Sequence, residues 1–594
     1  MNSLTIVFAA LGIFAIAYRF YGLWIARTVL TLDPNRPTPA VAMEDGKDYH
    51  KTNRYLVFGH HFAAIAAAGP LLGPVLAAQF GDLPGTLWII IGCVVGGAVH
   101  DMVILYASVR HKGKSLSLIA ESEIGKRAGF IASFSILFIL ILTLAGLSIA
   151  VVNALFQSPW GTFTVACTMP IAMLMGVYIE KIRPGDVMGA SIVGVSLLAL
   201  AIFAGPYVAQ NPAIATWFNY NKHQLALFIP IYGFFASVLP VWFLLCPRDY
   251  LSTYLKIGTI TALAVGILFV HPQLQMDSIT SFASGGGPVI PGKLFPFLFI
   301  TIACGALSGF HAIIGTGTTP KMIASEGDIL FVGYGAMLVE GFVAIMALMA
   351  ACVLVPADYF AINAAPASFA ALGMTPVNLP QLAAAVQEQL QGRPGGAVSL
   401  AVGMSYIFSG IPFFKTLTAY WYHFAIMFEA VFILTAVDAG TRVGRYMLQE
   451  LLGKVYPKMA DTSWMPGTAL TSLIFTFSWG YLVYTGNIAT IWPIFGMANQ
   501  LLATCALIIG TSMIIRMGRA RYAWITAVPG LFMVPVTMSA GYLNIVDNFY
   551  PKGLYLLCVI SAVLMLMMAL IFIDSFIRWY QLLQLDIKGE PEFT

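Results

Sequence analysis

The chain has 594 residues, of which 59% are hydrophobic and only 9% are charged. Soluble globular proteins carry about 25% charged residues, and a soluble fold of this composition would leave large apolar patches in water. The formal net charge of +4 comes from 30 Lys and Arg against 26 Asp and Glu, which gives no argument for nucleic-acid binding. The composition therefore predicts a membrane protein.

The chain opens with an apolar run from Leu4 to about Val29. This run is too long for the core of a signal peptide, and no small-residue cleavage site follows it, so we expect a retained membrane helix. The seven cysteines form no CxxC pair, and nearly all lie in apolar runs. They are expected to be buried thiols, without disulfides or a cysteine-bound metal.

A membrane-spanning helix needs roughly 20 mostly apolar residues, and fifteen such segments follow one another. They lie near 4–30, 57–80, 84–109, 129–156, 160–180, 186–208, 225–246, 253–271, 294–318, 329–354, 417–437, 466–485, 488–513, 522–545 and 552–580. A further apolar stretch near 397–413 contains Ser409-Gly410-Ile411-Pro412, which should interrupt a helix. We predict a re-entrant or half-spanning element there.

Basic residues gather in three segments between the spans, near 110–128, 438–465 and 514–521. The positive-inside rule places all three on the cytoplasmic side, with the N-terminus outside and the C-terminus inside. This count works only if 397–413 does not cross. The long mixed segment 356–396 is then extracytoplasmic, with a short amphipathic helix at Gln381–Leu390. It is either a cap over a pathway or a plain surface loop.

Glycine and proline cluster at two matched places inside apolar runs. Gly59, His61 and Pro70 recur as Gly309, His311 and Pro320, each 250 positions later. By the charge count, the first helix starts inside and the second starts outside, so the pair forms an inverted repeat. Such paired interruptions point to the binding site of a transporter. Kinks that only help helices to pack are the alternative.

A proline suits the first turn of a new half-helix. At membrane depth, the N-terminus of a half-helix offers free N–H groups and a positive dipole end, which suit a carboxylate. The predicted substrate-binding residues are His60, His61, Gly69, Pro70, His311, Gly315, Thr316, Gly317 and Thr318.

Several ionisable side chains lie inside apolar spans. Burying an ionised aspartate at a helix centre costs about 2.5–3.5 kcal/mol, so such groups are paired, face a cavity or move protons. We predict proton coupling by Asp101, His100, Glu340 and Glu429. An interfacial position is the alternative for Asp101, and His423 is expected to be a packing histidine.

Other chemistry finds little support in the sequence. His60 and His61 point about 100° apart on a helix and cannot easily share a metal ion, and the HExxH signature is absent. Gly113-Lys114-Ser115 has the tail of a P-loop, but Ser108 stands where its first glycine should be. We therefore expect no metal, no cofactor, no ATP hydrolysis and no enzymatic activity.

Three strings, spread over most of the length of the chain, resemble the carbon starvation protein A family. They are Asp45-Gly46-Lys47-Asp48-Tyr49-His50 running on to Leu83-Pro84-Gly85-Thr86-Leu87-Trp88, Ser308-Gly309-Phe310-His311 with Gly317-Thr318-Thr319-Pro320-Lys321, and Trp492-Pro493-Ile494-Phe495-Gly496-Met497-Ala498-Asn499-Gln500-Leu501-Leu502-Ala503. The resemblance implies an inner-membrane transporter for peptides or pyruvate that is coupled to protons and induced under nutrient limitation. It also implies a family domain over 1–410 and a C-terminal transmembrane region over 411–594. His100 departs from the family, which usually has Gln before the aspartate.

The sequence as a whole predicts an all-α polytopic membrane protein of about fifteen transmembrane helices plus a re-entrant element, with inverted repeats and broken helices. Its predicted function is secondary active import of a small carboxylate-bearing nutrient, pyruvate or peptides, by proton symport across the bacterial inner membrane. Protons, the substrate and membrane lipids are the expected partners. The alternatives are a Na⁺-coupled symporter, with Thr316, Thr318 and Thr319 beside unwound carbonyls, and a membrane nutrient sensor that does not transport.

Overall fold

The computed structural model describes residues 2–44, 49–183, 186–239, 244–386, 388–461, 464–486 and 488–588. Every named element in these ranges is a helix, which confirms the all-α prediction. Eleven helices are long and apolar enough to cross a membrane, or twelve if the bent pair Arg54–Ile65 and Gly69–Phe80 counts as one span. The chain is therefore a multi-pass membrane protein.

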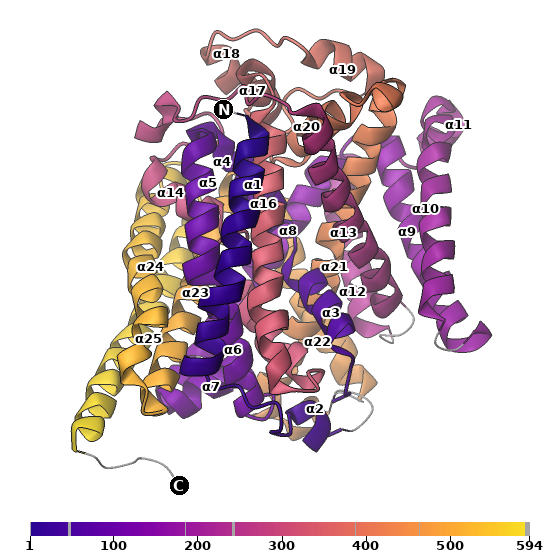
Figure 1. The fold of residues 1–594 in the computed structure, drawn as a ribbon. Helices are drawn as coiled ribbons and strands as arrows, with labels where there is room; N and C mark the ends of the chain where they lie inside the picture. The colour runs from indigo at the N-terminus through magenta and orange to yellow at the C-terminus, as the bar shows by residue number, and fades with distance from the viewer. Residues whose placement is uncertain are drawn as a thin grey trace.

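The long helices run side by side between two ends of the molecule (Figure 1). They are α1 (Ser3–Ile16), α5 (Asp82–Ile91), α6 (Ala98–Arg110), α8 (Lys126–Leu155), α9 (Pro159–Val177), α10 (Val187–Gln210), α12 (Lys222–Val238), α13 (Leu245–Val270), α16 (Ala336–Cys352), α20 (Ala397–Ser409), α21 (Thr418–Gly453), α22 (Met465–Thr485), α23 (Ile488–Arg516), α24 (Trp524–Leu543) and α25 (Tyr555–Lys588). The short helices are α2 (Pro39–Ala42), α7 (Leu116–Glu123), α11 (Pro212–Ala215), α17 (Pro356–Asn363), α18 (Pro366–Ala371) and α19 (Leu379–Val386).

Each of the fifteen predicted spans coincides with a helix or a helix pair, but the count of fifteen is not confirmed. Helix α12, helix α22 and the interrupted segment 294–317 are not among the eleven or twelve candidate spans. The predicted re-entrant stretch holds α20, a short apolar helix that ends at Ser409, directly before Gly410 and Pro412. Its re-entrant character stays a prediction.

The basic segments lie at one end of the molecule, with α2 and α7, while the N-terminus of α1 and helices α17–α19 lie at the other (Figure 1). Arg516 lies 3.2 Å from Glu123 of α7. Arg442 donates to the carbonyl oxygens of Ala236 and Leu239, where α12 ends. This separation is the one that the positive-inside prediction requires.

Two spans are interrupted near the middle of the molecule. Helix α3 (Arg54–Ile65) ends before Ala66, and α4 (Gly69–Ala77) continues after a bend of 45°. The predicted break at Gly69-Pro70 is therefore found. In the second span, α14 (Leu294–Thr301) and α15 (Gly309–Gly317) are separated by the non-helical segment 302–308.

The second glycine and proline cluster, Gly315–Pro320, contains a helix end, because α15 ends at Gly317 and a 3-10 turn over Thr319–Lys321 follows, with Pro320 in its first turn. Gly315 is an ordinary residue of α15, where a Cβ would lie 4.0 Å from Ile104 of α6. The structure adds a further interruption at 302–308, before His311, where a Cβ on Gly305 would lie 2.4 Å from the Cβ of Ala344. His61 and His311 both lie in a helix that ends shortly before a proline, at Ile65 before Pro70 and at Gly317 before Pro320. The inverted repeat itself stays a prediction.

Residues 356–386 and 388–396, here called the cap, cover the end opposite the basic segments (Figure 1). Helix α19 forms the first part of the predicted helix Gln381–Leu390, and Gln387 lies outside the described residues. The carboxylate of Asp358 accepts hydrogen bonds from the backbone N–H groups of Val377, Asn378 and Leu379. The cap is therefore an ordered layer and not a plain surface loop.

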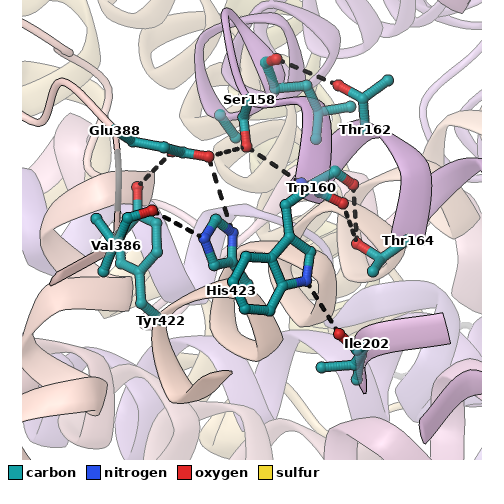
Figure 2. Close-up of polar contacts among 12 residues, drawn as sticks. Ser158, Trp160, Thr162, Thr164, Ile202, Val386, Glu388, Tyr422 and His423 are labelled. Carbon is teal, nitrogen blue, oxygen red and sulfur yellow. Dashed lines mark hydrogen bonds and ion pairs between the residues drawn. The ribbon is translucent and has the colours of Figure 1, made fainter. Parts of the chain in front are cut away.

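A buried polar cluster anchors the cap to the membrane helices (Figure 2). The Glu388 carboxylate accepts a hydrogen bond from Ser158, the N-cap of α9, and lies 3.8 Å from His423 Nδ1 on α21. His423 stacks on Trp160 at 3.8 Å between ring centroids. Arg393 pairs with Glu388 at 3.1 Å, and its other nitrogen donates to carbonyl oxygens at the end of α8. His423 is thus held by packing and by polar contacts.

Labelling of single cysteines should test the two ends. In a variant whose seven native cysteines are replaced by serine, Lys112→Cys and Lys454→Cys should react with a membrane-impermeant maleimide only after the cytoplasmic face is exposed. Thr375→Cys in the cap should react in intact cells. All three side chains are exposed. Reaction of Lys112→Cys in intact cells would contradict the topology.

Removing the charge of Arg393 should detach the cap. Arg393→Met leaves the Glu388 carboxylate buried without its cation, and breaking one partner of a buried pair costs about 3–5 kcal/mol. We expect a lower melting temperature and faster proteolysis within 356–396. Arg127→Met is the matched control, because Arg127 is largely exposed and lies 3.7 Å from Asp574, where such pairs contribute about 0–1 kcal/mol. Equal stability of the two variants would refute the anchoring role.

Candidate transport site

A cluster of three ionisable side chains lies where α6, α15 and α16 meet. The Nδ1 atom of His311 lies 2.8 Å from Oδ2 of Asp101, and its Nε2 atom lies 3.1 Å from Oε2 of Glu340. The other oxygen of Asp101 lies 2.7 Å from Nδ1 of His100. All four side chains are buried. The structure therefore brings together four residues that the sequence analysis selected from three separate segments.

His311 lies between two carboxyl groups, so its contacts depend on where protons are placed. A neutral imidazole has one N–H and one bare nitrogen, so it can satisfy only one of two ionised carboxylates. His311 faces a carboxyl group from each ring nitrogen, and the cluster is stable only if the imidazole is cationic or one carboxyl is protonated. Neither oxygen of Glu340 has a hydrogen bond to a described residue, although the pair distance suits an ion pair. Glu340 is thus the member most easily protonated or turned away.

The adjacent histidines of α3 contact the segment that follows α15. His61 Nδ1 lies 2.8 Å from the hydroxyl of Thr319, and His60 Nε2 lies 3.2 Å from the hydroxyl of Thr318. His61 is fully buried on α3, which packs against α15, and its Nε2 has no hydrogen bond within the described ranges.

The two helix breaks pack directly against each other. A Cβ on Gly69 would lie 2.2 Å from the sulfur of Cys304, and a Cβ on Gly73 would lie 2.4 Å from the carbonyl oxygen of Thr301. Gly69 and Pro70 form the first turn of α4, as expected. Only glycine permits this approach, so the N-terminus of α4 lies against the non-helical segment 302–308.

Asn499 of α23 holds the second half-helix in place. Its side-chain oxygen accepts a hydrogen bond from the backbone N–H of Phe310, and its amide nitrogen donates to Ser308. It therefore supplies the N-terminus of α15 with a partner that the helix lacks. Asn499 belongs to the third family string, but no role was predicted for it. An asparagine inside an apolar span was the available signal.

Lys256 of α13 is the second residue that the sequence analysis missed. Its ammonium group is fully buried and donates to Ala63 O and Ala66 O at the end of α3. A lysine inside the predicted span 253–271 was the signal for it.

Some of the predicted site residues lie apart from the cluster or make hydrogen bonds only within their own helix. Thr316 donates to the carbonyl oxygen of Ala312 within α15, and a Cβ on Gly317 would meet nothing within 4 Å. Glu429 is buried on α21, with no hydrogen bond to any described residue. Within the described ranges, the His, Cys, Asp and Glu side chains form no group of three or more that could hold a metal ion.

Hydrogen bonds to backbone groups join the broken helices to neighbouring segments at both ends of the molecule. At the cap end, the side chain of Gln79, just after α4, bonds to both backbone groups of Ile290. At the basic end, the N–H groups of His50 and Thr52 donate to the carbonyl oxygens of Lys321 and Met322. Each broken helix is therefore joined to a neighbouring segment at its end.

Comparison with known proteins identifies relatives along almost the whole chain. The family model for carbon starvation protein CstA matches residues 2–540. The peptide transporter CstA of Bacillus subtilis is 50% identical, over 98% of both chains. The Escherichia coli peptide transporter CstA is 50% identical over 91% of this chain and 81% of its own. The pyruvate/proton symporter BtsT of Escherichia coli is 45% identical, with the same coverage.

Solved structures show only distant likeness. A manganese transporter from Eremococcus coleocola gives a TM-score of 0.41 at 13% identity, covering 89% of this chain and 94% of its own. MhsT in complex with L-phenylalanine gives a TM-score of 0.46 at 12% identity, covering 89% and 100%. Neither likeness informs the site.

The full-length relatives are named as transporters and not as enzymes. The residues quoted for the resemblance now have places in the structure: Gly69 and Pro70 start α4, His311 lies in the buried cluster, and Asn499 holds the N-terminus of α15. The chain belongs to the carbon starvation protein CstA family.

Proposed function

We propose that the chain is a secondary active transporter that imports a small carboxylate-bearing nutrient together with protons across the bacterial inner membrane. Pyruvate and short peptides are the substrate classes, because relatives of 45% and 50% identity carry those substrates in their names. The observation that carries the proposal is the position of His311 between Asp101 and Glu340, beside two broken helices.

Proton coupling follows from the charge balance of the buried cluster. Its side chains lie in the membrane region, where an uncompensated charge is expensive. Adding or removing one proton decides whether His311 is balanced by one carboxylate or two. Asp101 is the fixed partner, because it also contacts His100. Glu340 is the exchangeable partner, because its oxygens lack hydrogen bonds to described groups. In the proposal, Glu429 is a further buried proton carrier on α21.

Substrate recognition is assigned to the half-helix ends and the histidines next to them. The N-terminal turn of α4, with Gly69 and Pro70, lies against the second break. His61 offers its Nε2 to a carboxylate, and His60 with Thr318 lines the adjacent polar surface. A carboxylate bound there would add a negative charge next to the cluster, because α3, which carries His61, packs against α15, which carries His311. Binding and protonation are thereby linked.

Transport needs the two closures to open in turn. At the basic end, the N–H groups of His50 and Thr52 donate to the carbonyl oxygens of Lys321 and Met322, and the Thr38 hydroxyl donates to the carbonyl oxygen of Ile323. At the cap end, Gln79 and the Tyr359 hydroxyl hold α4, the latter at 2.8 Å from Val75 O. Both closures act on the half-helices themselves, so movement of α3 or α4 would open a path to the cluster.

Uptake by proteoliposomes tests the proposed energy source. With radiolabelled pyruvate or a dipeptide, uptake should require an imposed pH gradient, should collapse with a protonophore and should not change when Na⁺ is replaced by K⁺. The reason is that the buried cluster consists of proton-binding groups. Uptake that follows a Na⁺ gradient at constant pH would instead identify a sodium symporter. Tight substrate binding without any uptake would identify a sensor.

Replacement of His311 or His61 by glutamine should uncouple transport. Glutamine keeps similar size and a donor but cannot take up a proton. His311→Gln and His61→Gln should be expressed and folded, and should reduce gradient-driven uptake by at least about tenfold, or ~1.4 kcal/mol. His271→Gln is the control, because His271 is exposed at the end of α13. Uptake at the wild-type rate in both folded variants would contradict these roles. Loss of folded protein would favour a packing role.

A further inference from the structure

Lys256 places a positive charge at the first helix break. It lies on α13 and is completely buried. Its ammonium group donates to Ala63 O at 2.7 Å, to Ala66 O at 2.9 Å and to the hydroxyl of Thr435 on α21 at 3.4 Å. The ring of Phe432 covers it at 4.1 Å. An ammonium group has three donors, and all three are used.

The two carbonyl oxygens are available because the helix ends there. In a continuous helix, the oxygen of Ala66 would accept a hydrogen bond from the N–H of residue 70, but Pro70 has no N–H. The oxygen of Ala63 would accept from Ala67, whose N–H instead donates to Ile65 O. Lys256 therefore supplies donors to two oxygens that the break deprives of their helical partners.

The ammonium is held by neutral oxygens. No described carboxylate forms an ion pair with Lys256; Asp249 on its own helix and Glu340 on α16 act on it only through space. Unwound carbonyl oxygens beside a hydroxyl are the ligands that hold Na⁺ in transporters with broken helices. The oxygens around Lys256 thus form a cation site, and the cation that fills it is the ammonium group of the lysine side chain.

The surroundings contain few other charges. Ionisable groups on the elements packed against α13 are Arg54, His60 and His61 of α3, Glu340 of α16, and His423, Glu429, Asp438, Arg442, Arg445 and Glu450 of α21. Asp438 is paired with Arg248 of α13 at 2.9 Å. Helices α1, α9, α10 and α20, which also contact α13, carry no charged side chain. Of these groups, Glu340 also belongs to the His311 cluster.

We propose that the break between α3 and α4 is a cation site occupied by the Lys256 ammonium, and that loss of the Lys256 proton releases α3 from α13 and α21. The second half of this statement rests on the proposed proton-coupled transport; the first half does not. Lys256 is a positioning residue in this scheme. It holds the half-helix whose movement opens the basic end, and its charge depends on a proton.

Removal of the side chain should create a sodium site, which can be measured without substrate. Lys256→Ala leaves the carbonyl oxygens and Thr435 facing an empty position. Its melting temperature should rise by about 2 °C or more when choline chloride is replaced by NaCl, because a bound ion stabilises the folded state. Wild type and Lys222→Ala, which removes a partly exposed lysine near the cap, should show no such difference. An equal melting temperature of Lys256→Ala in the two salts would overturn the cation site.

A second variant keeps the proposal testable if Lys256→Ala does not fold. Lys256→Arg keeps a cation with donors, but an arginine does not lose its proton. In a counterflow assay, this variant should exchange substrate across the membrane at a rate near that of the wild type. Its rate of uptake driven by a pH gradient should be at least about tenfold lower than that of the wild type. Gradient-driven uptake at the wild-type rate would overturn proton release by Lys256. If the proposed transport function is wrong, the wild-type protein itself will show no uptake, which distinguishes that outcome from a wrong role for Lys256.

Discussion

Backbone groups released where a helix breaks inside the membrane must find new partners, and this requirement organises the centre of the molecule. Each unsatisfied group in hydrocarbon costs several kcal/mol. At the end of α3 the partner is Lys256 of α13. At the start of α15 it is Asn499 of α23. Helices α13 and α23 are thereby fixed against the half-helices by hydrogen bonds as well as by packing.

The same breaks bring the ionisable groups together. The N-terminal turn of α15 carries His311 into contact with Asp101 of α6 and Glu340 of α16. When a histidine lies between two carboxyl groups, the three side chains can together hold one proton more than two carboxylates and a neutral ring. The side chains hold this proton directly, without a water molecule. Because the proton-binding group belongs to a half-helix, a change in its charge acts directly on an element that can move.

The two ends of the molecule are closed by different means. The cap end is held by a buried ion pair, a stacked histidine and side-chain bonds to backbone, as the contacts of Glu388, Arg393 and Gln79 show. The basic end is held near α3 by a short stretch of backbone pairing at Thr52. Glu326, in the segment after α15, is also buried at this end and pairs with Arg110 at 2.9 Å. The cap end thus relies on side chains, whereas the basic end combines backbone pairing with a buried ion pair.

The sequence by itself determined the membrane class, the helical fold and the position of the first break, because apolar length and proline act locally. It also identified His311, Asp101 and Glu340 as ionisable groups that the membrane would not hold without partners. Only the tertiary structure decided that these three meet, since they come from three helices far apart in the chain. It also revealed an interruption at 302–308, before His311, where a Cβ on Gly305 would lie 2.4 Å from the Cβ of Ala344. The roles of Lys256 and Asn499 depend on where distant carbonyl and N–H groups lie, and no local pattern specifies that.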